Sequence, residues 1–422
     1  MTIWRLTTAG LMFLATAGLA AQEKKPSGRA KGDAKPAAGS KADEPDPGKA
    51  KSDDSAVDDK GDDAKGDDDA GAATPEGTEF DKLYSEWKDL ITRLRELSLK
   101  YATARPGKDR EALKEEYAKL VSEGKELEPK FIAGAITAYA SNKKKYREVG
   151  DFLASIVKSY VESDDYEPAL APAKALIDEG YPNPRIYNLA GIAAFATNDF
   201  DNAEKYLKQA DKKSVLEEDG KRYLQHIDEY REMWQREQEL REAEAKADDL
   251  PRVLLKTNKG DIVIELFENE APNTVANFIS LVEKKFYDGV TFHRVLPQFM
   301  AQGGDPDGTG SGGPGHKIPC ECAEPNHREH FRGSLSMAHA GKDTGGSQFF
   351  LMFRPSGPGA GYNLDGKHTV FGRVIEGMDV LAKIQRIDPQ SPKAGVKADT
   401  IVEAKVLRKR EHEYVPKTIA GK

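Results

Sequence analysis

Apolar residues recur three, four and seven positions apart through most of the segment from 80 to 247, which is the period of an amphipathic α-helix. The runs at 80–94, 113–121 and 131–139 show this spacing most clearly. Turn signals at Pro106-Gly107 and at 142–145 divide the pattern. The sequence therefore predicts an all-α region over residues 80–247.

A repeat with a period of 34 residues lies inside this region, since the segment 165–169 matches the segment 199–203. The spacing resembles tetratricopeptide helix pairs, at about 150–183 and 184–217. About three such repeats are needed for a stable stack, so the flanking helices are expected to complete it. An ordinary helical domain with accidental periodicity is the alternative. Residues 235–249 are nearly all charged or alanine, and they predict a solvent-exposed helix that leads to Pro251.

After Pro251 the pattern changes to short β-branched and apolar runs. The runs 253–257 and 261–266 flank Asn258-Lys259-Gly260, which is a hairpin signal. Residues 272–282 predict an amphipathic helix, residues 378–384 predict a second one, and residues 290–296 predict a strand that must break at Pro297. Many short strands with two helices indicate a β-barrel with helical caps.

The chemistry-bearing residues of this second region are a cation, an amide and a group of apolar side chains. Arg294 and Gln302 flank Phe299 and Met300, and a glycine turn follows. No serine, cysteine or carboxylate pair has the arrangement of a nucleophile with its base. No Gly-Lys-Ser/Thr follows the glycines at 303–315, which argues against a phosphate loop. Taken singly, such residues are more often surface or core, so only the joint pattern points to a site.

This set suits a reaction without a covalent step, such as rotation about an X-Pro peptide bond. The barrier is about 18–20 kcal/mol because the C–N bond has partial double-bond character. As the amide twists, its nitrogen loses resonance and becomes a better hydrogen-bond acceptor. A guanidinium aimed at that nitrogen then binds the transition state more tightly than the ground state.

Four blocks carry a specific resemblance: Phe-His-Arg-Val-Leu-Pro-Gln-Phe-Met-Ala-Gln-Gly-Gly-Asp (292–305), Phe-Arg-Gly-Ser-Leu-Ser-Met-Ala-His-Ala-Gly (331–341), Gly-Gly-Ser-Gln-Phe-Phe (345–350) and Leu-Asp-Gly-Lys-His-Thr-Val-Phe-Gly (364–372). In this order they resemble the cyclophilin family of peptidyl-prolyl cis/trans isomerases, over about residues 250–410. The resemblance implies a closed β-barrel capped by two helices, proline-containing polypeptides as clients, and no cofactor or metal. It gives Arg294 and Gln302 the catalytic role. It assigns substrate binding to Phe299, Met300, Ala338, His339, Ala340, Gln348, Phe350, Leu364 and His368.

One position departs from the family pattern. Cyclophilins that bind cyclosporin well carry a tryptophan immediately before the Leu-Asp-Gly-Lys-His block, where this chain has Asn363. The preceding segment 355–361 is rich in Gly and Pro, like an insertion, and leaves open whether Tyr362 leans over the pocket instead. Weak cyclosporin binding is therefore expected.

The N-terminal residues predict export. Arg5, an apolar stretch at 9–19 and Gly18-Leu19-Ala20 have the form of a secretory signal peptide over residues 1–21, with an uncleaved anchor as the alternative. Residues 22–79 hold no aromatic residue, and Val57 is their only large aliphatic, so they predict a disordered charged linker. A periplasmic or secreted protein follows, without stable membrane insertion after cleavage. The net charge of −8 argues against nucleic acid as a partner.

The expected domains are the helical region 80–247, the isomerase domain 250–412 and a C-terminal tail at 413–422. The helical region is expected to fold independently and to recruit clients or a partner protein. A non-enzymatic module that only grips X-Pro segments is the alternative function. Cys320 and Cys322 are the only cysteines, and a bridge between them would close a strained ring, so free or intermolecularly paired thiols are expected. His316, His327 and His330 match no standard zinc spacing.

Overall fold

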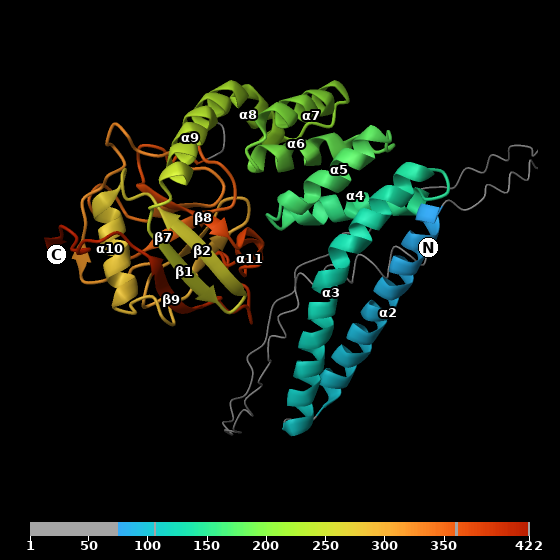
Figure 1. The fold of residues 1–422 in the computed structure, drawn as a ribbon, viewed down its shortest axis with the longest axis horizontal. Coiled ribbons are helices and arrows are strands. Elements are labelled where there is room, and N and C mark those ends of the chain that lie inside the picture. The colour runs from blue at the N-terminus through green and yellow to red at the C-terminus, as the bar shows by residue number, and fades with distance from the viewer. Residues whose placement is uncertain (1–74, 105–106, 359–361, 421–422) are drawn as a thin grey trace, which may run out of the picture. The chain divides into compact units, whose positions relative to one another are not determined.

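The computed structural model describes residues 75–104, 107–358 and 362–420 (Figure 1). The predicted signal peptide and the predicted linker as far as residue 74 lie outside the described residues, as does Pro106 of the first predicted turn. The first described helix, α2 (Pro75–Thr103), begins before the predicted boundary at residue 80. All of the described residues belong to one compact unit.

Helix α2 packs along α3 (Lys108–Ser141) to form a long helical hairpin, which Figure 1 shows in blue and cyan. The apolar stripes of the two helices face each other, and Trp87 is fully buried where its ring stacks on Phe131 at a centroid distance of 5.2 Å. The turn predicted at 142–145 separates α3 from the next helix.

Four shorter helices follow as two packed pairs: α4 (Arg147–Glu162) with α5 (Glu167–Asp178), and α6 (Arg185–Ala196) with α7 (Phe200–Lys212). Each pair corresponds to one predicted repeat segment, although α4 begins three residues before position 150, and α5 also packs on α6. Small residues allow the close approach, since a Cβ added to Gly191 would lie 2.6 Å from the side chain of Leu207. Asp199 caps α7 by accepting the backbone N–H of Asn202 at 3.1 Å.

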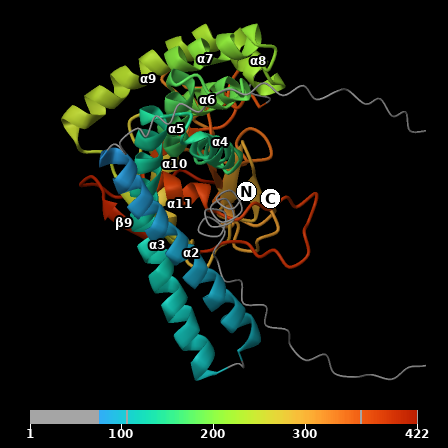
Figure 2. The same cartoon turned by 90° about the vertical axis from the view of Figure 1, so that its right-hand side faces the viewer.

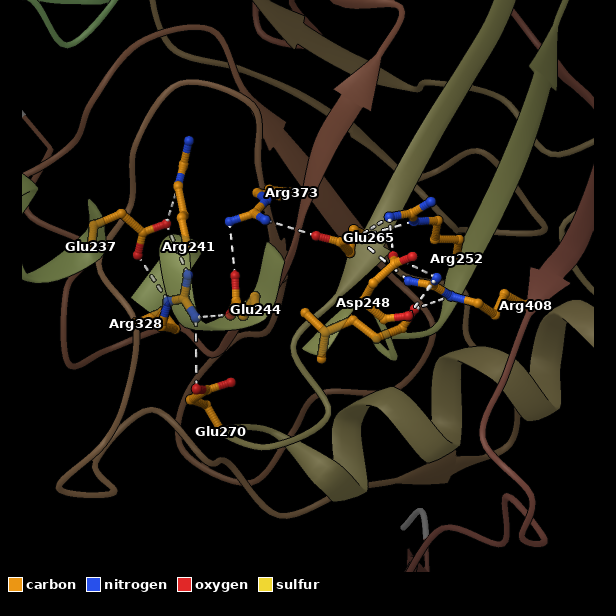
Figure 3. Close-up of polar contacts among 11 residues, drawn as sticks. Glu237, Arg241, Glu244, Asp248, Arg252, Glu265, Glu270, Arg328, Arg373 and Arg408 are labelled. Carbon is orange, nitrogen blue, oxygen red and sulfur yellow. Dashed lines mark hydrogen bonds and ion pairs between the residues drawn. The ribbon is translucent and has the colours of Figure 1, made fainter. Parts of the chain in front are cut away.

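Helices α8 (Glu218–Gln225) and α9 (Ile227–Ala247) lead to the second region (Figure 2). The predicted solvent exposure of residues 235–249 is wrong for two of their carboxylates, because Glu237 and Glu244 are buried. Figure 3 shows that both accept hydrogen bonds from Arg328. The Arg328 residue is only 2% exposed. These two buried carboxylates thus dock α9 onto the second region, whereas most other charged residues of the helix are exposed as predicted.

The second region is built on an antiparallel sheet of eight strands that curls on itself. The strands are β1 (Arg252–Thr257), β2 (Gly260–Leu266), β3 (Arg294–Leu296), β4 (Met300–Gly303), β6 (Ser334–Met337), β7 (Phe349–Met352), β8 (Val370–Glu376) and β9 (Ile401–Arg408), in the spatial order β3-β4-β7-β6-β8-β2-β1-β9. The predicted hairpin is confirmed, since β1 pairs with β2 through a turn at Gly260. The strand predicted at 290–296 is shorter in the structure, where only Arg294–Leu296 form strand β3.

The sheet is a curled half-barrel rather than the fully closed barrel that was predicted. Strands β3 and β9 are its edges in the described structure, and isolated bridges such as Thr291–Thr400 stand where a closed barrel has a continuous ladder. Both predicted helices are present, as α10 (Pro272–Glu283), which packs against β9, and α11 (Met378–Ala382), which packs against β2. Phe278 of α10, Phe349 and Phe371 meet in the buried core.

The C-terminal tail is tied to this region. Strand β10 (Ile419–Ala420) pairs with β5 (His316–Lys317), and the buried Tyr414 donates its hydroxyl to Glu268 at 2.9 Å. Cys320 and Cys322 are free thiols. Among the described residues, no helix is both long and apolar enough to cross a membrane.

Candidate active site

Strands β3 and β4 bring the predicted cation and amide together. Arg294 and Gln302 are direct partners in the antiparallel register, and the Arg294 Nη1 donates to Gln302 Oε1 at 3.3 Å. Gln302 Nε2 in turn donates to Gln348 Oε1 at 3.0 Å. Gln348 Nε2 donates to the carbonyl oxygens of Gly310 and Gly312 at 3.0 and 2.9 Å. This chain of amides fixes the orientation of Gln302 and presents its oxygen to the guanidinium.

An apolar floor lies beside this polar chain. Met300, Phe350 and Met352 are buried together, and four partly buried side chains pack against them: Leu296, Phe299, Ala338 and Leu364. The floor forms because β4 pairs with β7, which sets Gln302 opposite Phe350 and Met300 opposite Met352. Five of the predicted substrate-binding residues, Phe299, Met300, Ala338, Phe350 and Leu364, therefore meet in one cluster.

The outer wall of the pocket is an aromatic pair. Phe299 and Tyr362 stack at a centroid distance of 3.8 Å, and the guanidinium carbon of Arg294 lies 5.8 Å from the centre of the Phe299 ring. Asn363 is exposed, and its carbonyl oxygen accepts from Lys367 Nζ at 3.0 Å. The question left open by the sequence is resolved: Tyr362, and not Asn363, leans on the pocket.

Two of the predicted histidines form the opposite side. The ring of His368 meets Phe350 edge-on at 5.6 Å and stacks on His339 at 4.2 Å. His368 Nδ1 donates to the carbonyl of Met337 at 2.9 Å. Burial lowers the pKa of His368 to about 4, and burial also lowers the pKa of His339. At neutral pH the pocket therefore presents an uncharged imidazole.

The remaining predicted residue, Ala340, lies outside this cluster. It is exposed, and its backbone N–H donates to Thr344 Oγ1 at 3.1 Å. Ala340 belongs to the turn that follows β6 and reaches the site only through its neighbours His339 and Ala338.

A buried polar group behind the floor was missed by the sequence reasoning, which treated His330 only as a possible metal ligand. The His330 ring stacks on Phe350 at 5.8 Å, and its nitrogens lie 2.6 Å from Asp365 Oδ1 and 2.9 Å from Ser336 Oγ. Both His330 and Ser336 are fully buried, so this arrangement supports the floor and offers no nucleophile to a substrate. The closeness of His330 and Ser336 in the sequence, in and beside the 331–341 block, was the one feature that could have indicated this group.

The comparisons with known proteins match the second region of the chain to one family. The family model described as "Cyclophilin type peptidyl-prolyl cis-trans isomerase/CLD" matches residues 252–406. A peptidyl-prolyl cis-trans isomerase of Helicobacter pylori is 56% identical over 136 residues, which make up 32% of this chain and 80% of that protein. Peptidyl-prolyl cis-trans isomerase B of Bacillus subtilis is 56% identical over 118 residues, or 28% of this chain and 78% of that protein.

Among solved structures, a cyclophilin type peptidyl-prolyl cis-trans isomerase of Cryptosporidium parvum aligns with 31% identity and a TM-score of 0.34, over 38% of this chain and 99% of that chain. From the sequence relatives, the chain belongs to the cyclophilin-type peptidyl-prolyl cis-trans isomerases. It is an enzyme of that type, with a helical region on the N-terminal side of the catalytic domain.

Proposed function

We propose that this chain is an extracytoplasmic folding isomerase in which Arg294 carries the reaction and the helical region recruits the client. The observation that supports the catalytic part is the Arg294–Gln302–Gln348 chain set beside an apolar floor. A proline ring placed on Met300 and Phe350 has its imide nitrogen within the reach of the guanidinium. The oriented guanidinium then donates to that nitrogen as it becomes pyramidal, which favours the twisted state over both planar ones.

The recruiting role has a candidate surface. A cavity of about 630 Å³ opens between helices α3 and α5 and the segment that joins β8 to α11. Its lining mixes apolar side chains such as Ile132, Ile136 and Met378 with carboxylates such as Glu128 and Asp165. Burial raises the pKa of Asp165 to about 6. A tetratricopeptide-like stack offers such concave surfaces to extended peptides, and this one favours an apolar segment with a basic residue.

A groove variant tests the recruiting role without touching the catalytic residues. Ala133 is exposed on α3 and lines the cavity, so Ala133→Arg places a long cation in it. We expect the variant to keep full activity on a short X-Pro peptide and to slow the refolding of a large client whose folding is limited by proline isomerisation, because tethering raises the local client concentration. Ala118→Arg, at an exposed position of α3 outside the cavity, is the matched control. Equal client refolding rates in both variants would rule out this surface.

The extracytoplasmic location is supported by the signal-peptide pattern of residues 1–21. Expression of the full chain in a bacterial host, followed by fractionation and N-terminal sequencing, tests it directly. We expect a mature N-terminus near Ala21 in the exported fraction. A full-length N-terminus retained in the cytoplasmic fraction would contradict the proposal.

A further inference from the structure

Two loops that build the proline pocket are held from the helical region. One is the turn between β3 and β4, at residues 297–299, and the other, the second loop, is represented by its described residues 355–358 and 362–364. Phe299 belongs to the first and Tyr362 to the second, and these two rings form the aromatic wall of the pocket. Whatever fixes the two loops therefore fixes the wall.

Asp164 holds the first loop. It lies in the turn between α4 and α5, is fully buried and adopts a positive φ of 63°. Its Oδ1 accepts the backbone N–H of Gln298 at 2.8 Å and the hydroxyl of Tyr166 at 2.9 Å, and its Oδ2 accepts from Arg386 Nη2 at 2.7 Å. A charge-assisted bond from a buried carboxylate to a backbone N–H is among the stronger hydrogen bonds of proteins.

Gln298 needs this support. It has a φ of 59°, an unfavourable conformation for a residue with a Cβ, and its side chain is exposed, so the backbone N–H carries its contact with Asp164. The next residue is Phe299, whose carbonyl oxygen accepts the N–H of Phe353 at 3.0 Å. Arg386, bound to Asp164, lies 4.2 Å above the Phe353 ring. Asp164 thus restrains Phe299 by two routes, through the preceding residue Gln298 and through the packing of Arg386 on Phe353.

Tyr230 of α9 holds the second loop. Its hydroxyl donates to the carbonyl oxygen of Pro358 at 2.9 Å, while its fully buried ring packs against Phe195. Gly357 lies against it with a φ of 142°, and a Cβ there would lie 3.2 Å from the Tyr230 hydroxyl. The Gly357 N–H then donates to the carbonyl oxygen of Tyr362 at 3.3 Å, which carries the restraint to the wall residue.

We propose that Asp164 and Tyr230 are positioning residues for the isomerase reaction, through which the helical region sets the geometry of the Phe299–Tyr362 wall and hence the affinity for the proline substrate. The proposal rests on the placement of Phe299 in the proline pocket. It makes the helical region part of the active-site architecture, in addition to any role in recruiting clients. When the Phe299–Tyr362 wall is already in position, substrate binding has a smaller entropic cost. Loss of this positioning should therefore raise KM more than it changes kcat.

The test uses the full chain and a short X-Pro peptide, with kcat and KM determined separately. Asp164→Ala leaves Arg386 three backbone acceptors, the carbonyls of Ser163, Ala382 and Ile384. The donors that lose their partner are the Gln298 N–H and the hydroxyl of the buried Tyr166. We expect KM to rise about 3- to 10-fold with kcat changed less than about twofold. Tyr230→Phe, which keeps the ring and removes only the hydroxyl, is expected to raise KM about 2- to 3-fold.

Two further measurements separate positioning from general destabilisation. Glu237→Gln weakens another contact between α9 and the catalytic domain without touching either loop, so it should lower the melting temperature and leave KM unchanged. In a Tyr362→Ala background the effect of Asp164→Ala on KM should shrink, because the two act through one wall. An unchanged KM in both Asp164→Ala and Tyr230→Phe overturns the proposal, and so does an equal rise in Glu237→Gln. A wild-type chain without activity would instead contradict the site assignment itself.

Discussion

Phe299 and Tyr362 lie face to face, with their ring centroids 3.8 Å apart and their planes inclined by only 10°. Phe299 is partly buried against the pocket floor, whereas Tyr362 is 46% exposed and comes from the Gly- and Pro-rich loop. The pair extends the apolar wall of the pocket outward. A substrate residue beside the proline would therefore meet the Tyr362 ring on its way in.

Removing this ring should weaken substrate binding more than catalysis. Tyr362→Ala is expected to raise KM for an X-Pro peptide about 2- to 10-fold and to leave kcat nearly unchanged, because a stacked aromatic pair contributes about 0.5–1.5 kcal/mol beyond its buried area. Tyr362→Phe keeps the stack and is the control. A Tyr362→Ala enzyme with the wild-type KM would show that the ring does not contact the substrate.

Removing the guanidinium should affect the chemical step. Arg294→Ala is expected to lower kcat/KM by about 10²–10³, the scale for the loss of one preorganised donor. Arg294→Lys keeps the charge but loses the rigid fork that Gln302 orients, so most of the loss should remain. Both variants need a melting curve to show that they are folded. A folded Arg294→Ala enzyme with an unchanged rate would remove Arg294 from the mechanism.

The position of Asn363 leads to a prediction about cyclosporin. Asn363 is exposed and replaces an indole that would supply both an N–H donor and apolar area, so inhibition by cyclosporin should be weak. A buried tryptophan would contribute about 2–3 kcal/mol to the free energy of cyclosporin binding, and Asn363→Trp should restore part of this contribution. Competition with a peptide substrate measures this, with Asn363→Ala as the control. Nanomolar inhibition of the natural sequence would contradict the assignment.

The candidate site residues could be named from the sequence because they lie in short contiguous blocks, and these blocks carry the family resemblance. The hairpin of β3 and β4 places Arg294 beside Gln302, and the pairing of β4 with β7, which follows later in the chain, adds Phe350. The helices α4 to α7 were likewise indicated by local apolar spacing, while the tetratricopeptide character of the 34-residue period stays a prediction. In both cases the information lies within segments of a few tens of residues, where periodicity and turn residues decide the structure.

The sequence could not predict the contacts that join the two regions. Asp164 and Gln298 are 134 residues apart, and nothing in a polar turn between two helices marks its aspartate as buried. The charged composition of α9 favoured solvent exposure for the same reason. Glu237 and Glu244 are buried against Arg328, which is 91 and 84 residues away, and each has a further cationic partner, Arg241 and Arg373. Such pairs depend on tertiary packing, which propensity and periodicity do not encode.

The depressed pKa of His368 predicts how activity and stability depend on pH. Because its folded pKa is about 4 and its ordinary value is 6.5, the unfolded state binds the proton first as pH falls. The stabilising contribution of neutral His368 is therefore complete above about pH 6.5 and decreases between pH 6.5 and 4. We expect kcat/KM to fall near pH 4, when a charge appears beside the apolar floor. Denaturant melts at pH 7 and 5, with His368→Gln as the comparison, should show a smaller acid effect in the variant.

Arg328 provides the strictest test of the contact between α9 and the catalytic domain. Its guanidinium donates to Glu237 through Nε and Nη2, at 2.8 and 2.9 Å, and to Glu244 through Nη1 at 2.5 Å. It also lies 3.9 Å above the ring of Phe267 (Figure 3 shows the ion pairs). Burial acts against its charge, but the hydrogen bonds of Glu237 and Glu244 raise the pKa of Arg328 above its ordinary value. Arg241 also pairs with Glu237, and Arg373 also pairs with Glu244, so Arg328 is the cation that the two carboxylates share.

Arg328→Met should destabilise the protein, because Glu237 and Glu244 lose the cation that they share and keep one partner each, Arg241 and Arg373. Breaking a buried pair from one side costs about 3–5 kcal/mol, and the remaining partners should hold the loss below that range, which urea denaturation can measure as a lower midpoint. The deficit should shrink as pH falls toward 5, since the carboxylate of Glu237 can then bind a proton in the folded state. Arg93→Met is the matched control, because its pair with Glu123 is exposed and should contribute less than about 1 kcal/mol. Similar losses in the two variants, or a deficit independent of pH, would show that the buried cluster does not hold α9 against the catalytic domain.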